Sequence, residues 1–180
     1  MSYLDHVNAQ QLNLFRSIKL LACDVDGVFS DGRIYMGNDG EELKAFHTRD
    51  GYGLKAIMSL GIEVAIITGR RSAIVQNRMS ALGVKHIIQG EEDKGPALKT
   101  IQAKLGIAPD HTASIGDDMP DTAMYQYSKL AISVADGHPL VKQQAGYVTQ
   151  TPGGFGAVRE VCDLILLAHQ QLGDIHGASV

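Results

Sequence analysis

The sequence predicts an α/β fold, a Rossmann-like parallel sheet covered by helices on both faces. Three observations lead to this prediction: short apolar, β-branched runs recur along the chain, segments of helical periodicity separate them, and glycines stand where several helices end. Strands that alternate with helices imply right-handed crossovers and a mainly parallel sheet. A functional site is then expected at the carboxyl ends of the strands.

Six segments have the length and composition of strands. They are residues 18–23, 64–67, 85–89, 112–115, 130–134 and 147–149. Six others have helical character, residues 52–60, 72–82, 96–105, 120–127, 139–145 and 156–170. Gly61, Gly83 and Gly106 follow three of these helices, as expected where a chain leaves a helix through a left-handed residue.

One interval interrupts the alternation. Residues 33–36 and 42–47 have the pattern of two strands, and Gly37-Asn38-Asp39-Gly40 between them is typical of a tight turn. We therefore expect a β-hairpin flap after the first strand.

The length of 180 residues favours a single domain over 1–180, because it supports one core and is too short for two ordinary domains. We expect its core at about residues 12–172, and loosely held ends at 1–11 and 173–180. The sequence contains no internal repeat and no domain linker. No stretch reaches the roughly 20 apolar residues that span a bilayer, so we expect no membrane partner.

Charge and cysteine usage narrow the possible partners and location. The net charge is −4, and no run of Lys and Arg is interleaved with aromatic residues, so we expect no nucleic acid partner. The first residues lack the continuous apolar segment of a secretory signal, which favours a cytoplasmic protein. Cys23 and Cys162 are then expected to be reduced, buried thiols.

Four polar groups each follow one of the predicted strands. They are Asp24-Val25-Asp26-Gly27, Thr68-Gly69-Arg70, Asp93-Lys94 and Gly116-Asp117-Asp118. Because the carboxyl ends of parallel strands meet at one edge of a sheet, we expect all four groups there. A hydroxyl, a lysine and several carboxylates in one place favour phosphoryl transfer through an aspartyl intermediate.

Asp24 and Asp26 form the centre of the predicted site. They lie two residues apart, so in an extended segment their side chains share a face. We expect Asp24 to attack phosphorus. We expect Asp26 to protonate the departing alkoxide and then, as general base, to activate the hydrolytic water.

A divalent cation is required because carboxylates repel a phosphate. Magnesium prefers oxygen ligands and keeps several waters. We expect side-chain ligands from Asp24 and Asp117, with Asp26 and Asp118 completing the acidic metal-binding set. We also expect Asp118 to orient Lys94 or a metal-bound water.

Five further positions are expected to bind substrate beside Asp26. Thr68 can donate a hydrogen bond to a phosphoryl oxygen, together with backbone N–H groups at Gly69, and Lys94 can neutralise the phosphoryl charge. Arg70 and Arg49 are candidates to bind a substrate carboxylate, since a guanidinium can hold a carboxylate through two hydrogen bonds. Arg70 is preferred because it adjoins Thr68.

Each group has an ordinary structural alternative when it is taken alone. An acidic pair in a loop is commonly solvated, Thr68 can cap the following helix, and Lys94 lies in a charged cluster. Asp121 is expected only to favour the first turn of its helix electrostatically. The presence of all four groups in order favours the catalytic interpretation.

The four groups resemble the motifs of the haloacid dehalogenase superfamily, in the same order. Over about residues 15–170, the stretches DVDGVFSDG, FHTRDGYG, TGRRS, GDDMPD and GGFGAVRE further resemble members that hydrolyse 3-deoxy-D-manno-octulosonate 8-phosphate. This resemblance implies magnesium dependence, a homotetramer, a phosphorylated sugar acid as substrate and a role in lipopolysaccharide biosynthesis. Two departures are Phe29-Ser30 in place of Leu-Thr, and Phe155 in place of a Lys or Arg.

Superfamily members often carry a cap domain, and this sequence leaves no room for one. Only a hairpin and a helix separate the first two motifs, and two helices and a strand fill the interval from Thr68 to Gly116. We therefore expect a capless enzyme. We also expect a neighbouring subunit to close the site through the hairpin at residues 33–47.

Other functions remain open at this stage. A phosphatase for a nine-carbon sugar-acid 9-phosphate would share the fold and all four motifs. A catalytically idle oligomerisation module is a second alternative, although the catalytic set is intact. A phospho-acceptor signalling domain is disfavoured, because such domains place the acceptor Asp after the third strand and the Lys after the fifth.

Overall fold

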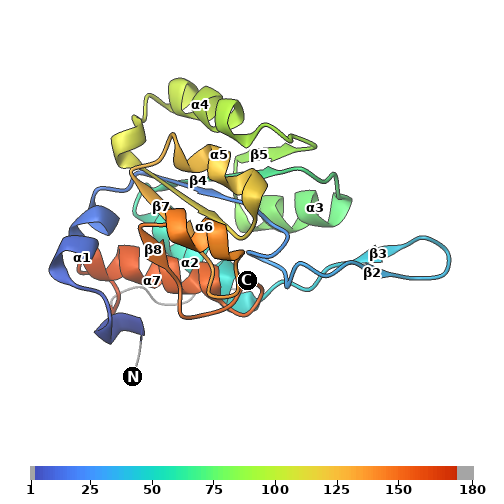
Figure 1. Cartoon of the computed structure of the whole chain (residues 1–180), viewed down its shortest axis with the longest axis horizontal. Coiled ribbons are helices and arrows are strands. Elements are labelled where there is room, and N and C mark those ends of the chain that lie inside the picture. Colours follow the sequence, from blue (N-terminus) through green and yellow to red (C-terminus); the bar gives the residue numbers. More distant parts are fainter. Residues whose placement is uncertain (1–2, 174–180) are drawn as a thin grey trace.

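The computed structural model describes residues 3–173 and contains a six-stranded sheet of order β5-β4-β1-β6-β7-β8, in which every neighbouring pair is parallel (Figure 1). The strands are β1 (Leu20–Cys23), β4 (Glu63–Thr68), β5 (His86–Gln89), β6 (Thr112–Gly116), β7 (Leu130–Ser133) and β8 (Tyr147–Val148). The predicted parallel α/β sheet is confirmed. The central strands β1, β4 and β6 are almost wholly buried, as expected for a sheet covered on both faces.

Seven α-helices accompany the sheet within residues 3–173. They are α1 (Ala9–Arg16), α2 (Thr48–Ser59), α3 (Ala73–Leu82), α4 (Lys94–Leu105), α5 (Thr122–Tyr125), α6 (Pro139–Gln144) and α7 (Ala157–Ala168). Short 3-10 turns occur at η1 (Tyr3–Asp5), η2 (Pro109–His111) and η3 (Met119–Asp121). None of the described helices is long and apolar enough to cross a membrane.

Two separate apolar clusters show that helices cover both faces of the sheet. The larger cluster packs side chains of α1, α2, α3 and α7 against one face, and the smaller packs α4 and α5 against the other. Figure 1 shows this layering, with α4 and α5 across the sheet from α1, α2 and α7. Burial of these apolar side chains is the main stabilising contribution to the fold.

Of the segment predicted to be loosely held, residues 1–11, the structure places Tyr3–Asp5 in the 3-10 turn η1 and residues 9–11 in the first turn of helix α1. Helix α1 begins at Ala9, and Asn8 and Gln11 form a reciprocal capping box at its start. Phe15 is fully buried, with its ring edge-on to Tyr147 at 5.4 Å between centroids. Of the predicted loose C-terminal end, residues 174–180 lie outside the described residues.

Helix α2 begins at Thr48, four residues earlier than predicted. Gly51 and Gly53 lower the helix propensity of this segment and obscured its start. The structure explains Gly53, since an added Cβ would lie 2.9 Å from the Cβ of Cys162 on α7. The glycine therefore permits the close packing of α2 on α7.

The predicted hairpin is present but shorter than expected. β2 (Tyr35–Met36) pairs antiparallel with β3 (Glu42–Leu43), and the arm projects away from the rest of the molecule (Figure 1). Its apolar side chains are exposed, including Ile34 and Met36, the latter at 69%. Within residues 3–173 no cap domain is inserted, which agrees with the capless prediction.

Candidate active site

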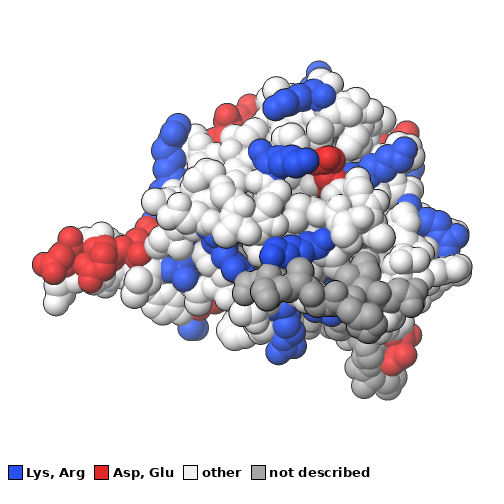
Figure 2. All heavy atoms as spheres, turned by 180° about the vertical axis from the view of Figure 1, so that it is seen from behind, with Lys and Arg blue, Asp and Glu red and all other residues white. Residues whose placement is uncertain are grey.

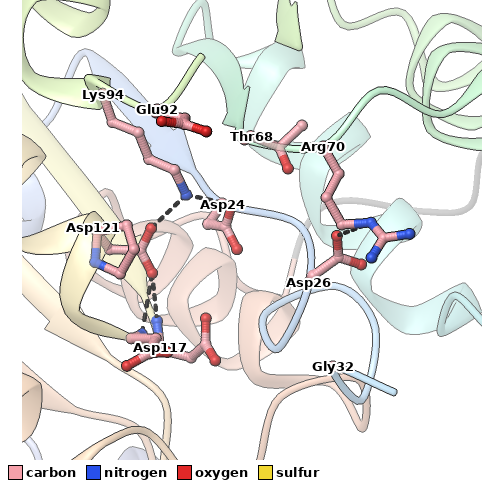
Figure 3. A pocket seen from close by; sticks show the side chains of 12 residues that line it. Asp24, Asp26, Gly32, Thr68, Arg70, Glu92, Lys94, Asp117 and Asp121 are labelled. Atoms are coloured by element: carbon pink, nitrogen blue, oxygen red, sulfur yellow. Dashed lines mark hydrogen bonds and ion pairs between the residues drawn. The ribbon is translucent and has the colours of Figure 1, made fainter. Parts of the chain in front are cut away.

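A pocket of about 510 Å³ lies where the carboxyl ends of β1, β4 and β6 meet (Figure 3). Its lining comprises Asp24, Asp26, Gly32, Thr68, Gly69, Arg70, Glu92, Lys94, Asp117, Asp118, Pro120 and Asp121. The four polar groups singled out in the sequence therefore come together at one edge of the sheet, as parallel topology requires.

Asp24 and Lys94 form a buried ion pair at the floor of the pocket. Lys94 Nζ lies 2.6 Å from Asp24 Oδ1 and 2.6 Å from Asp121 Oδ1, and all three side chains are less than 10% exposed. Burial raises the pKa of the Asp24 carboxyl above its ordinary value, with a further contribution from Asp121. Burial alone would lower the pKa of Lys94, but Asp24 and Asp121 raise it, so this lysine stays charged.

Asp121 has a larger role than the sequence indicated. Besides Lys94, it binds the backbone N–H groups of Asp117 at 2.9 Å and Asp118 at 3.2 Å through Oδ2. It is almost completely buried. The spacing of Asp118 and Asp121, three residues apart around η3, is the signal that could have identified this reciprocal cap.

The carboxylates of Asp24, Asp117 and Asp121 offer oxygens that all lie within 4.8 Å of one another. Burial and the neighbouring Asp121 and Asp24 raise the pKa of Asp117 to about 8. Such mutual repulsion is relieved by a divalent cation, and carboxylate oxygens are the ligands that magnesium prefers. These residues therefore fit a magnesium ion.

Within this cluster Asp24 and Asp117 have oxygens available for a metal, whereas Asp121 does not. Asp121 Oδ1 is engaged by Lys94, and Oδ2 accepts two backbone N–H groups. Gly27 makes room for Asp117, since a Cβ on Gly27 would lie 2.1 Å from Asp117 Oδ2. The glycine of the Asp24-Val25-Asp26-Gly27 turn thus has a steric reason in addition to its left-handed φ of 91°.

Asp118 lies at the predicted pocket, but the Lys94 contact that was one of its two expected roles is made by another residue. It lines the pocket, but its carboxylate accepts the N–H of Met119 and caps η3. It lies outside the three-carboxylate cluster, and the expected contact with Lys94 is made by Asp121 instead. Because Asp118 caps η3, its side chain turns back to the adjacent backbone and not towards Lys94.

Asp26 lies on the opposite side of the pocket from this cluster, next to Arg70 (Figure 3). Its Oδ1 accepts a hydrogen bond from Lys44, which follows β3 of the hairpin, and Arg70 Nε lies 4.0 Å from its Oδ2. Glu42 in turn contacts Lys44 at 3.1 Å and Arg70 at 2.6 Å. The hydrogen bond between Lys44 and Glu42 is the main cause of the lowered pKa of the Glu42 carboxyl.

Lys44 and Glu42 were not identified from the sequence. Both belong to a hairpin that the sequence presents as an exposed arm, so nothing local marks them as pocket neighbours. The side chain of Lys44 is nevertheless only 1% exposed. The hairpin projects from the molecule, but the lysine at its base is buried against Asp26, and only the three-dimensional structure reveals this contact.

Thr68, Gly69 and Arg70 lie at the end of β4 and line the pocket, as predicted. Thr68 is buried, and in Figure 3 its side chain lies on the Asp24 side of Arg70. Arg49, also predicted to bind substrate, is not among the residues that line this pocket. Because α2 starts at Thr48, Arg49 falls in the exposed first turn of that helix.

The Gly153-Gly154-Phe155-Gly156 loop packs beneath the loop that follows β1. A Cβ on Gly153 would lie 1.7 Å from the carbonyl oxygen of Gly27, and one on Gly154 would lie 2.5 Å from the N of Asp31. The N–H of Gly154 donates to the carbonyl oxygen of Val28 at 2.9 Å. The glycines therefore support the Asp24 loop by close packing, while Phe155 is 57% exposed.

Comparison with known proteins relates the chain to one family of hydrolases. Residues 83–160 match the family described as haloacid dehalogenase-like hydrolase. The chain is 49% identical over 174 residues to the 3-deoxy-D-manno-octulosonate 8-phosphate phosphatase KdsC of Escherichia coli (strain K12), covering 97% of this chain and 93% of the relative.

Solved structures show the same relationship in three dimensions. A putative 3-deoxy-D-manno-octulosonate 8-phosphate phosphatase from Vibrio cholerae is 61% identical, with a TM-score of 0.91 over 94% of each chain. The phosphatase of that name from Moraxella catarrhalis, solved with a magnesium ion, a phosphate ion and a KDO molecule, is 46% identical, with a TM-score of 0.89, covering 92% of this chain and 96% of that one. The chain belongs to the haloacid dehalogenase-like hydrolase family.

Proposed function

We propose that the protein is a magnesium-dependent phosphatase that converts 3-deoxy-D-manno-octulosonate 8-phosphate to 3-deoxy-D-manno-octulosonate and phosphate. The observation that carries the proposal is the buried Asp24 carboxylate, held by Lys94 at 2.6 Å at the floor of a pocket that also contains Thr68 and Asp26. The substrate is supported by two relatives named for this activity, one 49% identical and one, a putative phosphatase, 61% identical.

In the first half-reaction, a carboxylate oxygen of Asp24 attacks phosphorus. A bond forms between that oxygen and phosphorus as the bond from phosphorus to the sugar oxygen breaks. The departing oxygen takes the electron pair of the broken bond and receives the proton of the Asp26 carboxyl group. Lys94 neutralises charge on Asp24 and on the phosphoryl group, and Thr68 donates a hydrogen bond to a phosphoryl oxygen.

In the second half-reaction, water hydrolyses the aspartyl phosphate. Asp26, now a carboxylate, takes a proton from the water as its oxygen attacks phosphorus. The bond between phosphorus and the Asp24 oxygen breaks, and its electron pair returns to Asp24. Phosphate leaves and both carboxyl groups recover their starting states.

Asp24 and Asp117 are the side chains that would hold magnesium, since each has an oxygen free of the Lys94–Asp121 hydrogen bonds. The ion would supply positive charge between the carboxylates and the phosphoryl oxygens. Asp118 remains a candidate to contact a metal-bound water, because it lines the pocket. Asp26, directed towards Lys44 and Arg70, acts on the leaving group instead.

Arg70 is the side chain proposed to bind the carboxylate of the sugar acid. It lines the pocket, is 44% exposed, and carries a guanidinium that can form two parallel hydrogen bonds with a carboxylate. The exposed Arg49 has no comparable position.

We propose that the protein acts in the cytoplasm as a homotetramer with the hairpin at a subunit interface. The arm projects from the molecule and exposes Met36 at 69% and Leu43 at 64%, an apolar surface that a second subunit can bury. Exposed Asp39 and Glu41 give its far end the acidic cluster visible in Figure 2. Light scattering that reported an active monomer would contradict this arrangement.

The substrate assignment is tested by phosphate release with magnesium from a panel of phosphomonoesters. The panel includes 3-deoxy-D-manno-octulosonate 8-phosphate, a nine-carbon sugar-acid 9-phosphate and a neutral sugar phosphate. We expect the highest kcat/KM with the eight-carbon sugar acid. A higher kcat/KM with either other compound would assign that compound as the substrate. No turnover of any compound would favour the catalytically idle oligomerisation module.

A further inference from the structure

Lys44 is a buried lysine that connects the hairpin to the active-site pocket. Its Nζ donates a hydrogen bond to Asp26 Oδ1, and its side chain is only 1% exposed although it follows a strand of the projecting arm. Burial of an ammonium group is costly unless carboxylates compensate for its lost hydration. Here Asp26 and Glu42 provide that compensation.

Glu42 extends this contact to a second cation. One of its oxygens lies 3.1 Å from Lys44 Nζ, and the other accepts a hydrogen bond from Arg70 at 2.6 Å. Arg70 Nε is 4.0 Å from the second oxygen of Asp26. Two acidic side chains, Asp26 and Glu42, and two basic ones, Lys44 and Arg70, therefore form a closed ring of contacts, which fixes the geometry of its members.

Asp26 depends on this ring for its orientation. Within residues 3–173, its carboxylate also accepts a hydrogen bond from Ser30 Oγ at 3.4 Å, which is long for a strong bond. The hydrogen bond from the Lys44 ammonium is charge-assisted and therefore stronger. Without Lys44 the Asp26 side chain would be free to change rotamer at the mouth of the pocket.

We propose that Lys44 is a positioning residue that holds Asp26 on the leaving-group side of the pocket. The hairpin of a subunit is then part of the proton-transfer machinery of its own active site. This inference rests on the proposed function, in which Asp26 gives its proton to the departing oxygen. It assigns Lys44 no contact with the phosphoryl group, in contrast to Lys94 at Asp24.

The chemistry of the leaving group distinguishes this role from a structural one. When phosphorus is transferred to Asp24, a sugar alkoxide must receive a proton as it departs, whereas p-nitrophenolate is stable without one. A misplaced Asp26 therefore slows transfer from a sugar phosphate and barely affects transfer from p-nitrophenyl phosphate. The ratio kcat/KM covers the steps through formation of the aspartyl phosphate, so it isolates this half-reaction.

The test compares Lys44→Met with wild type on 3-deoxy-D-manno-octulosonate 8-phosphate and on p-nitrophenyl phosphate. We expect kcat/KM to fall about 100-fold on the sugar phosphate and less than about threefold on the nitrophenyl ester, in keeping with the usual contribution of general acid catalysis. Lys44→Arg, which keeps the charge, is expected to recover most of the loss. Lys129→Met removes an exposed lysine paired with Asp110 and serves as the matched control.

Equal losses on both phosphates would overturn the positioning role, and so would an unchanged kcat/KM on the sugar phosphate. Activity on p-nitrophenyl phosphate also reports that the site is assembled. If Lys44→Met does not yield folded protein, Lys44→Gln provides the same comparison. Failure of the proposed function is seen separately, as a wild-type protein that turns over neither phosphate.

Discussion

Lys94 Nζ lies 2.6 Å from Asp24 Oδ1, with Asp121 at the same distance on its other side, in a part of the pocket that is almost fully buried. One cation therefore compensates two carboxylates. The arrangement orients the nucleophile and makes both activity and stability depend on Lys94.

Replacing Lys94 with Met should abolish most activity and destabilise the fold. Loss of a preorganised charge at the reacting centre is expected to lower kcat by about 100- to 1000-fold. Leaving Asp24 and Asp121 uncompensated should cost about 3–5 kcal/mol of unfolding free energy near neutral pH. Phosphate-release kinetics and urea denaturation measure the two effects.

The stability loss in Lys94→Met should depend on pH in a defined direction. Without the ammonium, the pKa of the buried Asp24 carboxyl rises further above its unfolded value. A carboxyl with a raised folded pKa loses stability as the pH rises from the unfolded to the folded value. The difference from wild type should thus be larger at pH 8 than at pH 5, and a constant difference would contradict the ion-pair account.

Magnesium should stabilise the protein more at alkaline than at acidic pH. Burial and neighbouring carboxylates raise the pKa of Asp117 from 3.8 to about 8, and burial raises that of Asp50 to about 6. The metal-free folded state thus binds more protons than the unfolded chain between about pH 4 and 8, and its stability falls as pH rises. Magnesium competes with protons at Asp24 and Asp117, so it counteracts the fall in stability that these two carboxyls cause as the pH rises.

Melting temperatures recorded with and without magnesium from pH 5 to pH 8 measure this coupling. The difference between the two curves should grow with pH in the wild type. Asp117→Asn should remove most of it. A difference that shrinks towards pH 8 would mean that the metal binds elsewhere.

Gly154→Ala should destabilise the protein and lower activity, because the added Cβ would lie 2.5 Å from the N of Asp31 in the loop that follows β1. Gly61→Ala is the matched control, since Gly61 also has a positive φ, of 82°, but nothing lies within 4 Å of an added Cβ. We expect Gly61→Ala to cost about 1 kcal/mol from backbone strain alone. Urea denaturation should show a clearly larger loss for Gly154→Ala, and equal losses would contradict the packing role of this loop.

Glu160→Gln tests a buried anchor on the other side of that loop. Glu160 on α7 accepts hydrogen bonds from Tyr147 at 2.8 Å, from the N–H groups of Gln150 and Thr151, and from Thr151 Oγ1 at 2.6 Å. The NH2 group of a Gln would face the N–H and O–H groups that now donate to the Glu160 carboxylate. We therefore expect a loss of about 2–3 kcal/mol in unfolding free energy. Glu63→Gln is the control, since Glu63 is only half-buried and its ion-pair contact is with His86 at 3.6 Å; it should lose less stability, and a similar loss in both would refute the anchor role.

The fold was predictable because its signals are local. Apolar runs, helix-ending glycines and polar residues after strands are each visible within a few residues, and parallel topology then brings Asp24, Thr68, Lys94 and Asp117 to one edge. The N-terminal helix was missed because its evidence is a side-chain cap at Asn8 and burial of Phe15 by distant residues.

The remaining site residues depend on long-range geometry. Asp121 resembles an ordinary helix-start acid until Lys94 is seen 2.6 Å away. Lys44 lies 18 positions from Asp26 on an exposed arm, and no local pattern reveals that its side chain contacts Asp26. The converse holds for Arg49, which lies outside this pocket, since its place in the motif said nothing about which side of α2 it occupies.

The central claim, that Asp24 carries the phosphoryl group during turnover, is tested most directly by acid-quenched mass spectrometry. The Asp26→Asn variant should form the aspartyl phosphate from p-nitrophenyl phosphate and hydrolyse it slowly, because its general base is missing. We predict a phosphorylated peptide with the modification on Asp24, and no turnover in Asp24→Asn. Near-wild-type phosphate release by Asp24→Asn would contradict the account.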